Sequence, residues 1–437
     1  MTESRFSART AMAVVVANMI GTGVFTSLGF QLETIGSGFV LLMLWVVGGI
    51  TALCGALTYA ELGAALPRSG GEYNFLSEIY HPAAGFISGW VSATIGFAAP
   101  TALAAITFGT YLAAVFPSLS PTLLALGLVL ALTAAHASTH RSSGGVQRAF
   151  TLLKLLLILT FCLSAWALVE TPQQDVAFLP SSGDGALLFS GAFAVSLIYV
   201  NYAYTGWNAA TYMISELEAP ERNLSRVLIV GTLTVTVLYV LLNFTFLHVA
   251  PMDAMRGELE IGYVAARFAY GGTGAAIMGV VLAALLISTV SAMVMAGPRV
   301  LQVIGEDFRP FRVLARKNSH GVPTVAICFQ ALLTAVFIVT ASFEFILLFT
   351  GFTLGVNTFF TVLGIFVLKR RRPDLERPYR LPFYPLPPLI FLSLTGWTLA
   401  FILLSHPVEG LIGLGIIAVG GLFYALTRGV EKRVGTD

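Results

Sequence analysis

Two short stretches hold the residues that could bind a small polar molecule. The first is VNYAYTGWN, residues 200–208, in the middle of an apolar segment, residues 186–214. The second is ANMIGTGVF, residues 17–25, in the middle of the first apolar segment. When the stretches are aligned, three pairs of residues match: Asn18 with Asn201, Thr22 with Thr205, and Gly23 with Gly206. Two interrupted apolar segments at corresponding positions in two halves of a chain are typical of a transporter's binding site.

The GTG sequence of the earlier stretch can expose backbone groups inside a membrane. Gly21 and Gly23 flank Thr22, and glycine adopts conformations that interrupt a helix. An interruption leaves free amides at the start of the following half-helix, which suit a carboxylate, and free carbonyls at the end of the preceding one, which suit an ammonium group. One break can therefore bind both charged ends of an amino acid. The alternative is that the glycines only allow close helix packing, as small residues often do in membranes.

Aromatic and amide side chains in the later stretch have two interpretations each. Tyr202 and Trp207 either close over a bound molecule or simply pack in a helix bundle. Asn208 is polar and lies deep in an apolar segment, so it needs a hydrogen-bond partner, for which Tyr239 and Asn243 are candidates. Residues such as Tyr239 and Asn243 more often form hydrogen bonds within a helix bundle than contact a ligand.

Lys154 is the only basic residue inside an apolar segment. An ionisable side chain at membrane depth is a functional candidate, because burying its charge is costly. The alternative is snorkelling toward the membrane surface. Lys154 lies about 9 Å from Arg148 along a helix that rises 1.5 Å per residue, and a lysine side chain can reach several ångströms toward water.

The composition indicates a multi-pass membrane protein. Of the 437 residues, 57% are hydrophobic and 11% are charged, too few charges to cover a soluble protein of this size. The three cysteines, Cys54, Cys162 and Cys328, lie in apolar segments, so we expect no disulfide framework, metal site or cofactor. A net charge of +2 gives no reason to expect a nucleic-acid partner. The polar start of the chain is too short for a cleaved signal peptide, so the first apolar segment should act as an uncleaved signal.

We predict an all-α membrane protein of twelve transmembrane helices, each of about 20 residues, the length that a bilayer core requires. The spans begin near Thr10, Gly38, Ala83, Thr122, Ala149, Ala186, Val227, Gly274, Thr324, Phe345, Leu386 and Pro407. Basic residues favour the cytoplasmic side of such helices. With a cytoplasmic N-terminus, all but three of the 24 basic residues fall on that side, and the exceptions are Arg256, Arg267 and Lys154. This distribution supports both the count of twelve and cytoplasmic termini.

The connections between spans are too short to form a soluble domain. Residues 170–184 carry acidic but no basic side chains, as expected for an outer connection. In residues 252–270, apolar side chains recur at helical spacing, at Ile261, Val264, Ala265 and Phe268. This pattern predicts a short amphipathic helix on the outer surface, and the alternative is an ordinary exposed loop.

Several motifs together resemble the amino acid–polyamine–organocation (APC) superfamily and, within it, the L-amino-acid transporter (LAT)-like branch. IGTGVF, residues 20–25, resembles the first-helix motif of that family, and YAYTGWN, residues 202–208, resembles its sixth-helix motif. SELEAPERNLSR, LYVLLN and VLKRRRPDLERPYRLPFYPLPP are similar to later segments of the family, at residues 215–226, 238–243 and 367–388. The motifs run from the first to the eleventh predicted span, in the family's order.

The resemblance implies one transmembrane domain, residues 1–437, built from two inverted repeats of five helices with helices 1 and 6 broken, plus two C-terminal helices. The repeats would be residues 1–170 and 186–372, and the last two helices would lie within residues 383–427. Tyr202 would be the gating aromatic. The implied substrate site is lined by Met19, Ile20, Gly21, Thr22, Gly23, Val24, Tyr202, Ala203, Thr205 and Gly206.

Four further residues are implied in gating and coupling. Asn208 and Tyr239 would form a polar contact between helices 6 and 7. Related transporters carry a lysine in helix 5 where sodium-coupled relatives bind sodium between helices 1 and 8. Lys154 matches that lysine, and Ser288 and Thr289 are the hydroxyls of helix 8 expected near it. Lys154 would brace the broken part of helix 1, either as a fixed charge or by releasing a proton in each cycle, and sodium coupling is disfavoured.

The chain departs from the family's pattern at two places. Thr205 stands where relatives of broad specificity have glycine, which should narrow the side-chain pocket. Animal relatives form a disulfide with a heavy chain through a cysteine after the third helix, but here that connection reads FPSLSP, residues 116–121. We therefore expect no disulfide-linked heavy chain.

These features favour a transporter of small to medium neutral L-amino acids, an exchanger that works by alternating access in the cell membrane. Neither broken stretch holds a carboxylate, which disfavours cationic substrates. The main alternative is a proton-coupled uptake permease for amino acids or small amines. An enzyme is disfavoured because the spans hold no convergent set of His, Cys and carboxylate residues, and a nutrient sensor because there is no output domain.

Overall fold

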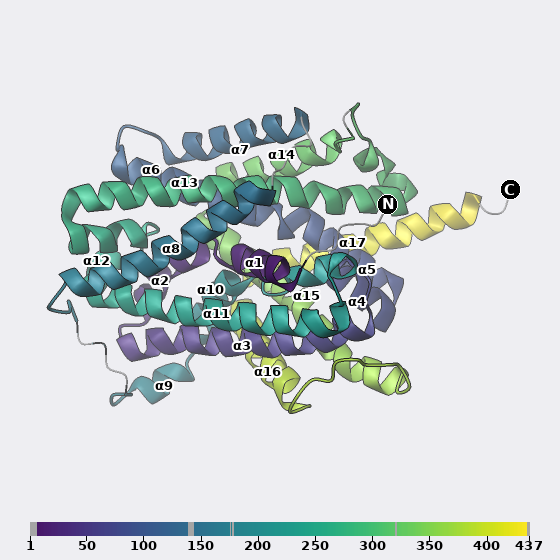
Figure 1. Ribbon diagram of the computed structural model, residues 1–437. Helices are drawn as coiled ribbons and strands as arrows, with labels where there is room; N and C mark the ends of the chain where they lie inside the picture. The colour runs from purple at the N-terminus through teal and green to yellow at the C-terminus, as the bar shows by residue number, and fades with distance from the viewer. Residues whose placement is uncertain (1–6, 139–143, 175, 177–178, 320, 435–437) are drawn as a thin grey trace.

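Every regular element in the described part of the chain is helical (Figure 1). The computed structural model describes all residues except 1–6, 139–143, 175, 177–178, 320 and 435–437. Within the described residues, nine helical segments are long and apolar enough to cross a membrane, and two shorter apolar helices, Pro121–Ala137 and Thr324–Thr340, accompany them. The protein is therefore a multi-pass membrane protein, as its composition predicts. Arg5 and Arg141, which contribute to the expected orientation, lie outside the described residues.

Most of the long helices run along one common direction, and α17 extends beyond the others at one end (Figure 1). The long helices that are not interrupted by a predicted break are α3 (Gly38–Ala65), α6 (Ala98–Val115), α7 (Pro121–Ser138), α8 (Gly144–Leu168), α11 (Pro220–Val249), α13 (Ile261–Asp307), α14 (Thr324–Thr340), α15 (Phe343–Arg371), α16 (Leu386–Ser405) and α17 (Pro407–Val434).

Both predicted breaks are present. The first apolar segment forms α1 (Ala8–Met19) and α2 (Gly23–Thr34), which are separated by residues 20–22. The segment with the second stretch forms α10 (Gly191–Tyr204), and a 3₁₀ helix (Ala209–Glu216) follows it after residues 205–208. Each interruption coincides with the Thr-Gly pair that the two stretches share.

Serine residues begin four of the apolar helices. The side chains of Ser7, Ser37, Ser190 and Ser342 each accept a hydrogen bond from the backbone amide three residues later. A serine at this position pairs an amide that the helix itself leaves free. These caps fix where α1, α3, α10 and α15 start, and α10 therefore starts at Gly191, later than the predicted Ala186.

Several short helices lie between the long helices or continue into them. They are α4 (Glu72–Ile79), α5 (Pro82–Val91), which continues through a π-helix (Ser92–Gly96) into α6, α9 (Asp184–Leu188), α12 (Met252–Met255) and a 3₁₀ helix (Arg309–Ala315). Residues 261–270, which carry the predicted amphipathic pattern, form the first part of α13, and Gly271, with a φ of 74°, separates them from the rest of that helix. Ile261 and Ala265 of the predicted apolar face are fully buried, whereas Phe268 is 45% exposed.

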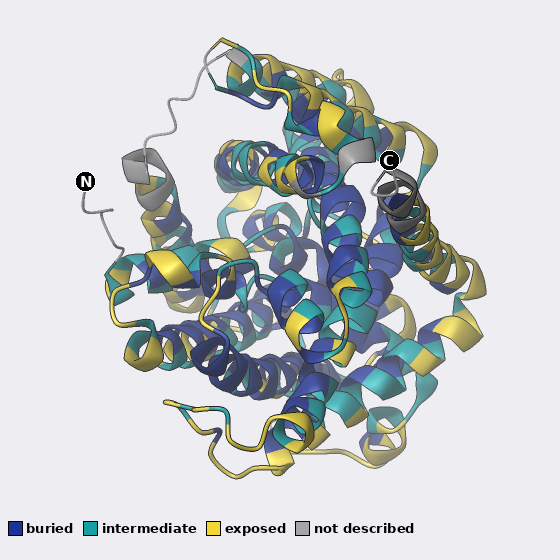
Figure 2. Cartoon of the chain, turned by 90° about the vertical axis from the view of Figure 1, so that its right-hand side faces the viewer, coloured by how far each residue is buried: buried dark blue, intermediate teal, exposed yellow. Residues whose placement is uncertain are grey.

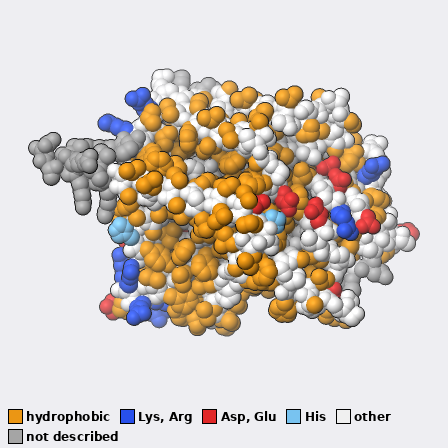
Figure 3. All heavy atoms as spheres, turned by 180° about the vertical axis from the view of Figure 1, so that it is seen from behind, with side chains coloured by type: hydrophobic (Ala, Val, Ile, Leu, Met, Phe, Trp, Pro, Cys, Tyr) orange, Lys and Arg blue, Asp and Glu red, His pale blue; other side chains and the backbone are white. Residues whose placement is uncertain are grey.

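Buried residues gather on the inner helices, and exposed residues lie on the outside of the bundle (Figure 2). Many of the exposed side chains are large and apolar, such as Leu123, Leu163, Val237 and Leu404. On the face seen in Figure 3, hydrophobic side chains cover the middle, most Lys and Arg lie at one end, and Asp and Glu gather toward the other. An apolar outer surface of this kind is what helices in contact with lipid require.

Candidate functional site

The two breaks lie against each other, and each approach depends on a glycine. A Cβ at Gly23 would lie 2.6 Å from the Cα of Ala203, and a Cβ at Gly206 would lie 2.8 Å from the carbonyl carbon of Asn18. Gly206 also has a φ of 102°, which residues with a side chain rarely adopt. The two interrupted helices therefore form one packed unit.

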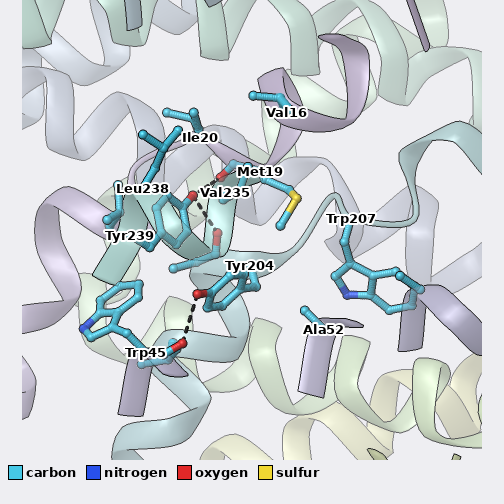
Figure 4. Close-up of a cluster of buried hydrophobic side chains, with 14 of the residues drawn as sticks. Val16, Met19, Ile20, Trp45, Ala52, Tyr204, Trp207, Val235, Leu238 and Tyr239 are labelled. Atoms are coloured by element: carbon cyan, nitrogen blue, oxygen red, sulfur yellow. Dashed lines mark hydrogen bonds between the residues drawn. The ribbon is translucent and has the colours of Figure 1, made fainter. Parts of the chain in front are cut away.

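Tyr239 of α11 joins the two breaks through its hydroxyl group (Figure 4). The hydroxyl lies within hydrogen-bond distance of the carbonyl oxygens of Met19 and Ala203, the latter at 3.1 Å. Trp45 packs edge-on against the Tyr239 ring, with ring centroids 5.5 Å apart, and its carbonyl accepts a 3.0 Å bond from the Tyr204 hydroxyl. A tyrosine hydroxyl has one proton, so Tyr239 donates fully to only one of its two carbonyls at a time.

The backbone around the first break offers unpaired groups of both polarities. Within the described structure, no hydrogen bond engages the amides of Thr22, Gly23 and Val24 at the start of α2, or the carbonyls of Ala17 and Asn18 near the end of α1. Amides at a helix start suit an anion, and carbonyls at a helix end suit a cation. This break can therefore bind a carboxylate and an ammonium group through the main chain.

Three of the residues predicted to line the site from the first helix have buried side chains, so that only their backbone is available to a ligand. Met19, Ile20 and Val24 are at most 1% exposed and pack in the core. Gly21 differs from its neighbours, because a Cβ there would meet no atom closer than 4.0 Å. Gly21 and Lys154 both line a small cavity of about 10 Å³, which is room for about one water molecule.

Lys154 of α8 lies between the first break and α13. Its ammonium group donates to the carbonyl of Ile20 at 3.0 Å and to the hydroxyl of Thr289 at 2.8 Å, and the residue is 6% exposed. The ammonium group thus points to the first break and α13, which favours the bracing role over snorkelling, although the side chain of Arg148 lies outside the described residues. Thr289 provides the bond from α13, and Ser288, the hydroxyl predicted there, is buried next to it.

The positive charge of Lys154 is stabilised by the C-terminal end of a helix and not by an acidic side chain. Among the described residues, no acidic side chain forms an ion pair with Lys154. The carbonyl of Ile20 lies just past the C-terminal end of α1, where the helix dipole is negative. A cation at this position therefore stabilises the end of the broken helix and is stabilised by it.

Tyr202 covers the first break from the side of α10. Its side chain is 6% exposed, and its phenol lies against the side chain of Thr22. The hydroxyl of Thr205 donates to the carbonyl of Tyr202 at 2.6 Å. The residue predicted to gate the site thus contacts the first break directly.

Comparison with known proteins decides the family. The profile of the amino acid permease family matches residues 6–424. The chain belongs to this family. Permeases are transporters, so the protein is a transporter and not an enzyme.

Three relatives show how far the similarity extends. Human Large neutral amino acids transporter small subunit 2 is 30% identical over 438 residues, which cover 95% of this chain and 79% of the human protein. Mouse b(0,+)-type amino acid transporter 1 is 27% identical over 424 residues, covering 95% of this chain and 86% of the mouse protein. Mouse Asc-type amino acid transporter 1 is 29% identical over 429 residues, covering 94% and 78%.

The buried carboxylate of Glu72 forms hydrogen bonds to the second break of this permease and to the segment that follows it. The sequence did not lead us to predict this contact. Glu72 is the first residue of α4 and is 2% exposed. Its oxygens accept hydrogen bonds from Tyr59 at 3.0 Å, from Asn208 and from Tyr212. Among the described residues, no basic side chain forms an ion pair with Glu72. Three neutral donors therefore stabilise this carboxylate.

The predicted contact between Asn208 and Tyr239 is wrong. Asn208 donates to Glu72, whereas the Tyr239 hydroxyl faces the carbonyls of the two breaks. The prediction failed because partners for Asn208 were sought only on helix 7, and no acidic partner was anticipated near the end of α10. The available signal was SGGEY, residues 69–73, in which an acidic residue directly follows two glycines.

The glycines at the breaks give separable predictions. Gly23→Ala and Gly206→Ala should lower the thermal stability of the purified permease, because the added methyl group meets backbone at 2.6 Å and 2.8 Å. Gly21→Ala should keep the parent's stability and weaken binding, because its methyl group projects into open space at the break. Thermal unfolding in detergent and transport in liposomes measure the two effects. A Gly23→Ala protein with the parent's stability and transport rate would contradict the close approach of α2 to α10.

Glu72→Gln should lower both thermal stability and transport rate. Glutamine offers one acceptor oxygen to three donors, and hydrogen bonds to a charged group contribute about 1.5–3 kcal/mol each. Glu78→Gln on the same helix is the matched control, because the Glu78 side chain is 44% exposed and pairs with Arg372 at 3.3 Å. Such surface pairs contribute little. Equal unfolding temperatures for the two variants would show that Glu72 does not hold the segment.

Proposed function

We propose that this permease exchanges neutral L-amino acids across the cell membrane by alternating access. The observation that carries the proposal is the first break, where unpaired amides and carbonyls match the carboxylate and ammonium groups shared by all amino acids. Among the described residues, the charged side chains that hydrogen-bond to a break are Lys154 and Glu72, and both already have protein partners. Neither is left to pair with a charged substrate, so the side chain of the substrate should be neutral. The relatives support amino acids as the substrate class, since two are amino acid transporters by name and the third is a transporter subunit for large neutral amino acids.

The proposed architecture has twelve spans in two inverted repeats, residues 1–170 and 186–372, with two further helices within residues 383–427. The nine long segments, the two shorter apolar helices and the interrupted α10 support this count. The reciprocal packing of Gly23 on one broken helix and Gly206 on the other supports a repeat. The concentration of basic residues at one end of the bundle supports cytoplasmic termini.

In the proposed mechanism the substrate lies at the breaks and Tyr202 closes over it. Its carboxylate binds the amides at the start of α2, and its ammonium group binds carbonyls at the end of α1. Lys154 braces the first break through Ile20 and Thr289 while α1 and α10 move relative to α13. Binding through the main chain explains how one site accepts different neutral amino acids.

Two proposals follow from the departures from the family's pattern. The side chain of Thr205 narrows the space beside the second break, so small to medium substrates are preferred. Residues 116–121 contain no cysteine, and Cys54, Cys162 and Cys328 all lie in apolar helices. We therefore propose that no heavy chain is attached by a disulfide.

Exchange is tested with purified permease in liposomes. Liposomes loaded with unlabelled alanine should accumulate labelled alanine several-fold faster than empty liposomes, with and without sodium, because each inward step requires an outward one. The result should be the same without a pH gradient. Equal uptake into empty and loaded liposomes that requires an inward proton gradient would replace exchange by proton-coupled uptake, and no uptake of any neutral amino acid would overturn the proposal.

Lys154→Ala should reduce exchange by roughly tenfold or more, because it removes two hydrogen bonds from a charged donor that contribute about 1.5–3 kcal/mol each. Leu153→Ala is the control, since Leu153 is the neighbouring residue on α8 and its side chain faces outward. Rates are measured from pH 5 to 8. A pH-independent parent supports a fixed charge, a strongly pH-dependent parent supports a lysine that releases its proton, and parental rates for Lys154→Ala at every pH would remove Lys154 from the mechanism.

A further inference from the structure

A cavity of about 70 Å³ lies beside the second break, between α3, α10, α15 and α16. Tyr202 and Thr205, which are both predicted to line the substrate site, form part of its wall. Ile198 and Asn201 of α10 also line it, whereas α2 approaches α10 at Ala203, so the cavity lies to one side of the contact between the breaks. A water molecule needs roughly 10–15 Å³ on this scale, so the cavity has room for a group of several non-hydrogen atoms.

The threonine hydroxyls in the wall of this cavity present mainly hydrogen-bond acceptors. Four threonine hydroxyls in it donate their proton to a carbonyl of their own segment, over 2.6–3.1 Å, and belong to Thr51, Thr205, Thr358 and Thr398. A hydroxyl has one proton and two acceptor lone pairs. Because the proton of each of these four hydroxyls is donated to a carbonyl, the hydroxyl oxygens can only accept hydrogen bonds from a molecule in the cavity.

Two more polar groups of the wall have no partner in the described residues. They are the hydroxyl of Thr395, a residue that is 5% exposed, and the amide of Asn201. Asn201 is half-buried, but a polar group on a residue as buried as Thr395 is nearly always hydrogen-bonded in folded proteins. An occupant of the cavity that carries a donor would satisfy Thr395 and find acceptors on the other hydroxyls.

The occupant must be uncharged. None of the residues that line the cavity, all of them in the described part of the chain, is acidic or basic. An ionised group placed there would be desolvated without a partner, which is strongly unfavourable. A hydroxyl or carboxamide group pays no such cost and donates one or two hydrogen bonds.

We propose that this cavity receives the side chain of the transported amino acid and favours side chains with a hydroxyl or a carboxamide group. The proposal rests on the proposed function and refines its substrate class. Tyr202 and Thr205 line both the cavity and the predicted binding site, so a substrate held by its main-chain groups at the breaks extends its side chain past these two residues. Among neutral amino acids of similar size, those with a side-chain donor bind more tightly.

The test compares polar and apolar substrates of similar size in liposomes. Serine, threonine and glutamine compete with labelled alanine, as do alanine, valine and methionine. Thr395→Val and Thr398→Val keep the shape of the side chain and remove an acceptor, and Thr395→Ser keeps the hydroxyl. Thr234→Val is the matched control, because Thr234 is exposed on α11 and its hydroxyl donates to its own helix in the same way, at 2.8 Å.

Each valine variant should weaken competition by the polar amino acids about 2- to 10-fold relative to the apolar ones, the effect of losing one hydrogen bond. Thr395→Ser and Thr234→Val should keep the parent's ratio of polar to apolar competition. An unchanged ratio in both valine variants, with normal exchange of alanine, would mean that the cavity holds only water and would overturn the proposal. A parent protein that transports no neutral amino acid would instead overturn the proposed function, and this inference with it.

Discussion

Every backbone amide and carbonyl inside a membrane needs a hydrogen-bond partner, and this requirement governs the structure. Two helices interrupted at the same depth would each expose amides and carbonyls that lipid cannot satisfy. The two helices shield and pair many of these groups by packing together. Gly23 packs on Ala203, Gly206 packs on Asn18, and the Tyr239 hydroxyl lies within hydrogen-bond distance of one carbonyl from each broken helix. The groups that this arrangement leaves unpaired, amides at the start of α2 and carbonyls at the end of α1, are complementary to the two charged ends of an amino acid.

The same requirement accounts for the buried lysine. The carbonyl of Ile20 is one of the groups released by the first break, and Lys154 pairs it while Thr289 of α13 pairs the lysine. A charge that would be costly in lipid thus becomes the link between the broken helix and two unbroken ones. Any movement of α1 relative to α13 must break one of these bonds or carry both partners along, so the lysine ties the conformation of the break to the position of α13.

Features set by local composition could be predicted from the sequence, and features set by tertiary packing could not. A Thr-Gly pair in an apolar segment marked each break, and a lone basic residue marked Lys154. The pairing of Asn208 with Glu72 required knowing that residues 72–79 form a helix whose first residue meets the segment that follows α10. Likewise, only the packing of α2 distinguishes Gly23, which meets Ala203, from a glycine two residues earlier that faces open space.

The single proton of Tyr239 couples the two breaks. Its hydroxyl lies between the carbonyls of Met19 and Ala203, one from each broken helix, and can be donated fully to one of them only. In the proposed mechanism the ammonium group of the substrate binds near the end of α1, next to the carbonyl of Met19. If that carbonyl accepts a hydrogen bond from the ammonium group, the Tyr239 proton is left to Ala203, and the hydrogen bond from α11 to α10 becomes stronger. One proton thus links the two breaks, because a change in its position alters the hydrogen bonding of both.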